Sequence, residues 1–297
     1  MRFATATAFR ASLDDRVKRR ASESGLEVPR FRKQIVFERL IARLELIAPG
    51  RYVVKGGYAL DVRFGERART TQDLDLVIVD SQDAVVDDLD AASSLGVGDF
   101  FSFDIKRTSA LDALGDGVAV RFRVEARLAG KIFERVRVDI GFDGVGTSAM
   151  EHATGVDVLG FADVPPVQMS ILPLVQHVAE KVHAYTRVYE GARQSSRVKD
   201  LVDLVLIAEL SALRADQLTA ALESTFAARG RQALPATLPR PVTEWTTPYR
   251  YLAEEVTIDP NIEAGWEAAS AFLNPVLAGE VDPEAVWSAS DQRWIVG

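Results

Sequence analysis

The stretch Val53-Val54-Lys55-Gly56-Gly57-Tyr58-Ala59-Leu60, followed by Thr70-Thr71-Gln72-Asp73-Leu74-Asp75-Leu76-Val77-Ile78, decides the fold of this chain. It predicts a short apolar strand, a glycine pair that opens a helix, a basic turn, and a second strand that carries two carboxylates. Gly56 and Gly57 can take positive φ and let a ligand come close to the backbone. The helix that begins there would direct its unpaired N–H groups toward an anion.

The two aspartates of the second strand share one face. Side chains alternate along a strand, so Asp73 and Asp75 lie on one side while Leu74, Leu76 and Ile78 line the other. Carboxylate oxygens are the ligands that Mg²⁺ prefers, and the neighbouring glycine turn suits phosphates. The pattern therefore predicts a site for Mg²⁺, or Mn²⁺, that carries a nucleoside triphosphate (NTP).

This ordered string resembles motif I of the polymerase-β-like nucleotidyltransferases. Its residues, KGGYAL followed by TTQDLDL, resemble those of the AbiEii/MenT branch, the toxins of abortive-infection and toxin–antitoxin systems. The resemblance covers roughly residues 50 to 210. It implies an α+β fold, in which a polymerase-β-like nucleotidyltransferase domain with a small mixed sheet precedes a C-terminal helical domain. The superfamily often has Gly-Ser where this chain has Gly56-Gly57, so backbone N–H groups would replace a hydroxyl as the phosphate contact.

A third carboxylate stands in the strand-like run 133–140, where Arg137 and Asp139 share the face opposite the apolar side chains. Asp139 is either an edge-strand acid that faces water or a third metal ligand. The resemblance implies the second role, because the polymerase-β fold supplies an acid from a strand beside the Asp-x-Asp strand. Three acids would balance the charge of two Mg²⁺ ions better than Asp73 and Asp75 alone.

A second group of charged residues opens the helical half. Lys181 lies on the predicted helix 175–185, and the string Arg197-x-Lys199-Asp200-x-x-Asp203-Leu204 opens another helix. Read without the family, Lys181 and Asp200 form an ion pair between helices. In AbiEii/MenT-like chains the same pattern implies that Lys181 neutralises the triphosphate and that Asp200 is an essential active-site acid. It also implies that Lys199 and Arg197 contact the nucleotide, while Asp203 stabilises its helix or pairs with a nearby base.

Several further residues admit two interpretations. Thr71 lies on the face of the two aspartates, so its hydroxyl either meets the metal or phosphate or only suits the strand. Arg63, Arg67 and Arg69 in the basic turn are either exposed to solvent or contact phosphate. The basic run 16–20 is either a solvated helix face or a patch that faces RNA.

Composition limits the class of protein. The 297 residues are 47% apolar and 26% charged, as in a globular protein with a substantial core. The chain has no cysteine, which excludes disulfides and thiol chemistry and fits a cytoplasmic protein. No apolar run of about 18 residues occurs, and the N-terminal residues are densely charged, so neither a membrane span nor a secretory signal is expected. The net charge of −8 argues against broad nucleic-acid affinity but allows a local basic patch.

We expect two domains, with a boundary near residue 165, where the sequence changes to predominantly helical patterns. Residues 1–165 would form the nucleotidyltransferase domain with its N-terminal helices, over 8–24 and from Pro29 to about 48. Residues 166–297 would form the helical domain, with helices near 214–228 and 260–275, that completes the active-site cleft. Gly and Pro punctuate 144–173, and within this stretch Pro165-Pro166 predicts a connector.

The expected reaction is metal-dependent transfer of a nucleoside monophosphate from an NTP to a hydroxyl. By resemblance, the acceptor is the 3′ end of tRNA, translation is blocked, and a cognate antitoxin is the partner. One alternative is a nucleotidyltransferase that acts on a protein hydroxyl or on a small molecule such as an aminoglycoside. The other is a non-catalytic module that binds a nucleotide or a partner protein.

Overall fold

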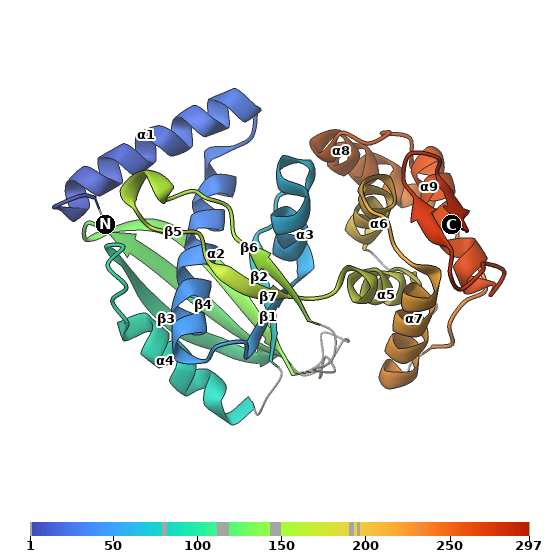
Figure 1. Ribbon diagram of the computed structural model, residues 1–297, viewed down its shortest axis with the longest axis horizontal. Coiled ribbons are helices and arrows are strands. Elements are labelled where there is room, and N and C mark those ends of the chain that lie inside the picture. Colours follow the sequence, from blue (N-terminus) through green and yellow to red (C-terminus); the bar gives the residue numbers. More distant parts are fainter. Residues whose placement is uncertain are drawn as a thin grey trace. The chain divides into compact units, whose positions relative to one another are not determined.

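The structure is a computed structural model that describes residues 2–78, 82–111, 119–142, 150–189, 193–194, 197–230 and 232–296. The chain divides into two compact units (Figure 1). The first comprises Met1–Arg63 and Thr70–Leu172, and the second comprises Phe64–Arg69 and Pro173–Gly297. The predicted division into domains 1–165 and 166–297 stays a prediction, because compactness does not test independent folding.

The first unit is built on a mixed sheet. Its strands, counted over the described residues, are seven and lie in the order β3-β4-β5-β2-β1-β7-β6, with β2–β5 and β1–β7 parallel and the other pairs antiparallel. The strands are β1 (Tyr52–Lys55), β2 (Asp73–Ile78), β3 (Phe101–Leu111), β4 (Ala119–Leu128), β5 (Lys131–Gly141), β6 (Glu151–Thr154) and β7 (Gln168–Ile171). The helices are α1 (Ala6–Ser24), α2 (Val28–Ile47), α3 (Gly56–Phe64) and α4 (Val85–Ser94). The mixed sheet with helices confirms the predicted α+β class.

The core of this unit lies on one face of the sheet. Along β4, Phe122 and Val124 are buried in the core, whereas Arg121 and Arg123 alternate with them and lie on the opposite face. Helices α1, α2 and α4 contribute apolar side chains to the same cluster, and α2 crosses the strands (Figure 1). The polar side chains of β2, β4 and β5 therefore gather on the face turned away from these helices.

Local sequence accounts for the two N-terminal helices. Thr5 caps α1 by accepting the N–H of Ala8 on its hydroxyl at 3.2 Å, and Gly25 ends the helix in the left-handed conformation. Pro29 stands in the first turn of α2, where its missing N–H costs nothing. Both helices begin and end close to the predicted residues.

The second unit is mainly helical. Its helices are α5 (Leu174–Tyr185), α6 (Val198–Leu210), α7 (Ala215–Arg229), α8 (Thr246–Val256) and α9 (Ile262–Leu277), and its strands are β8 (Val188–Tyr189), β9 (Arg193–Gln194), β10 (Val286–Ser288) and β11 (Arg293–Ile295). Helices α7 and α9 match the predictions. The sequence did not predict α8 or the hairpin β10–β11. Tyr249 and Val256 are fully buried, and this packing forms α8 despite its Thr-Thr-Pro start.

The stretch 144–173, which Gly and Pro punctuate, also contains β6 and β7, and the sequence predicted neither strand (residues 143–149 lie outside the described part). Strand β7 is only four residues long and lies buried beside β1, so it shows no alternation that the sequence could reveal. Among the described helices, none is both long and apolar enough to cross a membrane.

Candidate active site

Three predicted acids meet on the polar face of the sheet. Strands β2 and β5 are parallel neighbours, and their register places Asp75 directly opposite Asp139 and Asp73 opposite Arg137. Asp73, Asp75 and Asp139 therefore share one face of two adjacent strands. Because β5 lies between β4 and β2, the alternative of an edge-strand Asp139 is wrong.

Each of these acids stands opposite a basic residue of a neighbouring strand. Arg137 donates to both carboxylate oxygens of Asp73, at 2.5 and 3.0 Å. Arg121 on β4 donates to both oxygens of Asp139, at 2.7 and 2.6 Å. The hydrogen bonds to Asp139, and the charges of the three acids, raise the pKa of Arg121 despite partial desolvation. Lys55 on β1 lies in register with Asp75.

The glycine pair lies against this acidic face. Gly56 opens α3 with φ +65°, and a Cβ built on it would stand 1.9 Å from Oδ2 of Asp75. Only a residue without a side chain fits there, so the backbone at the start of α3 touches the carboxylate. Gly57 follows in the first turn and is buried. The Thr71 hydroxyl donates to the carbonyl oxygen of Asp73 at 3.0 Å and so braces the start of β2.

The donor set fits a hard divalent cation, because it consists of carboxylate oxygens from adjacent strands beside a glycine cradle. In the described part of the chain, no group of three or more His, Asp or Glu side chains is arranged as a metal site. In this structure Arg137 binds the carboxylate of Asp73, and Arg121 binds that of Asp139.

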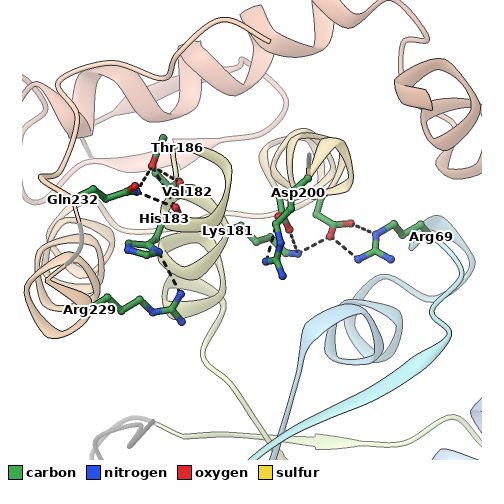
Figure 2. Close-up of polar contacts among 10 residues, drawn as sticks. Arg69, Lys181, Val182, His183, Thr186, Asp200, Arg229 and Gln232 are labelled. Atoms are coloured by element: carbon green, nitrogen blue, oxygen red, sulfur yellow. Dashed lines mark hydrogen bonds and ion pairs between the residues drawn. The ribbon is translucent and has the colours of Figure 1, made fainter. Parts of the chain in front are cut away.

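The second group of predicted residues meets inside the helical unit. Lys181 on α5 is buried and lies 2.5 Å from Oδ2 of Asp203 and 3.4 Å from Oδ1 of Asp200, both on α6 (Figure 2). Arg69 binds both oxygens of Asp203 at 3.0 Å. Burial alone would raise the pKa of Asp203, but Lys181 and Arg69 lower it to about 2. The expected ion pair between the helices is present, and Asp203 pairs with bases as predicted.

The other predicted contacts of this group lie at the start of α6. Arg197 is the residue before the first turn, and its guanidinium is 3.8 Å from Oδ2 of Asp200. Lys199 is exposed, whereas the Asp200 carboxylate is buried. Arg197 therefore precedes the first turn of α6, and Lys199 and Asp200 lie within that turn but point to different sides of the helix.

Sequence reasoning missed the partners of these acids. Arg69 was expected in solvent or on phosphate, yet it binds Asp203. Arg63 binds Glu151 and the carbonyl oxygen of Leu172, and Arg67 binds Glu209, so neither is a free surface cation. No pattern within a short stretch of sequence predicts these partners, because they lie far away along the chain. Alternation along β4, however, could have placed Arg121 on the polar face of the sheet.

His183, one of the two histidines of α5, packs inside the helical unit. His183 is fully buried, packs edge-on against Phe226 and has Nδ1 3.4 Å from Arg229 (Figure 2). Gln232 donates to the carbonyl oxygen of His183 and to the hydroxyl of Thr186.

A family model described as nucleotidyl transferase AbiEii toxin, Type IV TA system, matches residues 39–290. The chain belongs to the AbiEii family. This AbiEii chain is therefore a nucleotidyltransferase, and the match spans both groups of charged residues described above. The resemblance found in its motifs is confirmed.

Two crystal structures are similar to this AbiEii chain. JHP933 from Helicobacter pylori has 15% sequence identity, covers 84% of this chain and 94% of its own, and superposes with a TM-score of 0.48. The "putative nucleotidyltransferase from H. pylori" has 15% identity, coverages of 82% and 92%, and a TM-score of 0.43. No curated protein matches this chain. Because the sequence identities are 15% and the TM-scores are below 0.5, the assignment to the family depends on the family model alone.

Proposed function

We propose that this AbiEii nucleotidyltransferase transfers a nucleoside monophosphate from an NTP to a hydroxyl of RNA, with Mg²⁺ or Mn²⁺ as cofactor. One observation carries the proposal. Asp73, Asp75 and Asp139 share one sheet face, and the Gly56 backbone at the start of α3 lies against Asp75. Carboxylates beside an anion-binding helix start suit a metal-bound triphosphate.

Asp73, Asp75 and Asp139 would hold the metal. When bound, the ion polarises the phosphoryl group and neutralises charge on the triphosphate. The N–H groups of Gly56 and Gly57 bind phosphate oxygens at the start of α3. Asp139 accepts the proton of the attacking hydroxyl.

The charged residues of the helical unit bind the nucleotide in this proposal. Lys181 stabilises the charge that develops on the pyrophosphate leaving group. Asp200 is an essential acid that orients Lys181, and their 3.4 Å contact supports this role. Lys199, exposed at the start of α6, and Arg197 contact the nucleotide. These roles come from the family pattern.

A row of basic residues favours RNA as the acceptor. Arg137, Arg123 and Lys106 lie in register across β5, β4 and β3, and the row begins at Asp73 on β2. Like charges directly opposite each other on neighbouring strands destabilise a sheet, so this row suits a polyanion. It disfavours a polycationic aminoglycoside.

The basic run of α1 is a weaker candidate for RNA. The guanidinium of Arg16 lies 4.3 Å from the ring centre of Phe161, and that of Arg20 lies 4.9 Å from the ring centre of Phe31. Both arginines thus pack on aromatic rings of their own unit. By family resemblance, the RNA is tRNA, modified at its 3′ end in the cytoplasm, and a cognate antitoxin relieves the translation block.

The decisive experiment incubates total RNA with each labelled NTP in turn and compares wild type, Asp73→Asn and Asp104→Asn. Asp104 is the matched control, because it is an exposed acid on the same sheet paired with Lys106. Asp73→Asn should lose at least about a hundred-fold in transfer, since a bound metal supplies several kcal/mol of charge stabilisation. Its unfolding midpoint should stay close to that of wild type.

Sequencing the extended 3′ ends would identify the acceptor. RNA labelling by Asp73→Asn at the wild-type rate would refute the mechanism. Labelling of a protein or an aminoglycoside in place of RNA would refute the proposed acceptor.

A further inference from the structure

The acidic face is neutralised by the chain itself. Three carboxylates on adjacent positions of two strands repel one another, and each has a base in register on the next strand. For Asp73 that base is Arg137, and for Asp139 it is Arg121. These guanidinium groups bind the same oxygen atoms that a metal would take.

Arg137 and Arg121 differ in how easily a metal ion can displace each from its carboxylate. Arg137 is 52% exposed and Asp73 29% exposed, whereas the Arg121–Asp139 pair is 27% and 18% exposed. Solvent-exposed ion pairs contribute little free energy, so a divalent cation can displace Arg137 from Asp73. Arg121 is the more firmly held of the two.

A released Arg137 needs another anion. Guanidinium has five donors and no acceptor, and it stays charged at any pH of interest. On β4 its cross-strand neighbour is Arg123, a second cation. Release from Asp73 would leave two like charges side by side, which an incoming phosphate relieves. The planar fork that binds both carboxylate oxygens suits two phosphate oxygens equally well.

We propose that Arg137 is an exchangeable counter-ion, which holds Asp73 in the free enzyme and moves to the triphosphate when metal and nucleotide bind. The inference rests on the proposed function, because it requires a metal at Asp73. It makes Arg137 a competitor of the metal and a ligand of the nucleotide. A purely structural ion pair would have neither property.

The test measures Mn²⁺ binding without nucleotide, by electron paramagnetic resonance, in wild type, Arg137→Ala, Arg137→Lys and Arg135→Ala. Arg135 is the matched control, because it lies two residues earlier on β5, is 60% exposed and pairs with Glu125 instead of the site. Arg137→Ala should bind Mn²⁺ about three-fold more tightly, the fold-change expected from losing a competing exposed ion pair. Arg137→Lys should fall between Arg137→Ala and wild type, because it keeps the charge and loses the fork.

Nucleotide binding gives the second readout. At saturating Mn²⁺, the NTP concentration for half-saturation should rise about ten-fold in Arg137→Ala, because the variant loses a charge-assisted hydrogen bond to the triphosphate. Arg135→Ala should change neither value. Unchanged or weaker Mn²⁺ binding by Arg137→Ala, or unchanged NTP binding, would overturn the counter-ion role. If wild type binds no Mn²⁺ that Asp73→Asn removes, the proposed function fails as well.

Discussion

Adding one methyl group at Gly56 should separate the chemistry of the site from the stability of the fold. Gly56 has φ +65°, and the Cβ of an alanine there would lie 1.9 Å from Oδ2, 2.7 Å from Cγ and 2.9 Å from Cβ of Asp75. Because the Cβ of Asp75 is itself too close, a rotation of the carboxylate cannot relieve the clash. Gly56→Ala must therefore move the Asp75 side chain or the start of α3.

Gly50 provides a matched control for the backbone. It has φ +69°, and no atom lies within 4 Å of the Cβ position, so Gly50→Ala meets the backbone penalty alone. That penalty is about 1–2 kcal/mol for a non-glycine residue in the left-handed region. Gly56→Ala adds an overpacking term of about 1–3 kcal/mol. The free energy of unfolding should fall by about 2–5 kcal/mol for Gly56→Ala and by about 1–2 kcal/mol for Gly50→Ala.

Urea unfolding and single-turnover transfer from labelled NTP would test both effects. Gly50→Ala should transfer nucleotide at the wild-type rate. Gly56→Ala should be slowed about a hundred-fold at a temperature where it is fully folded, because misplacement of a reacting group by about 1 Å has effects of that size. Equal rates for the two variants, each shown to be folded, would refute the role proposed for Asp75 beside Gly56.

Two further predictions concern buried charges. Asp203→Asn leaves Lys181 and Arg69 without their shared counter-charge, so the free energy of unfolding should fall by about 3 kcal/mol. The pKa of Asp203 is lowered from 3.8 to about 2 in the folded protein. The difference in unfolding free energy between wild type and Asp203→Asn should therefore be constant above pH 3.8 and shrink as pH falls toward 2. A difference that does not change with pH in acid would contradict the pairing. Burial raises the pKa of Glu38 from 4.5 to about 7, so between these pH values the native protein holds a proton that the unfolded chain releases. The contribution of Glu38 to the free energy of unfolding should therefore fall by about 3 kcal/mol as pH rises from 4.5 to 7. Glu38→Gln keeps an acceptor for the Val156 N–H and should remove this contribution from the slope of urea midpoints measured across that range. A slope equal to that of wild type would show that Glu38 does not contribute to it.

The local features of the site were predictable because short-range geometry fixes them. Alternation along a strand puts Asp73 and Asp75 on one face whatever the strand pairs with. Helical spacing likewise puts Asp200 and Asp203 on one side of α6, where both contact Lys181, and the glycine pair marks a backbone that a ligand can approach. The family match then confirmed what the ordered motifs indicated.

The unpredicted features depend on partners distant in sequence. The four-residue β7 acquires its place by pairing with β6 and with β1, and β1 lies more than a hundred residues earlier. Helix α8 forms from weak helix formers because its apolar residues are buried. Neither feature leaves a periodic pattern in its own stretch of sequence.

The sequence by itself determined which residues carry charge on which face of each element, and the family to which the chain belongs. Only the tertiary structure decided that Asp139 stands opposite Asp75, that Arg137 and Arg121 neutralise the acids, and that Arg69 binds Asp203. The physical reason is that side-chain direction follows from backbone periodicity over a few residues. The register of one strand against another, in contrast, is set by the packing of the whole sheet and its core.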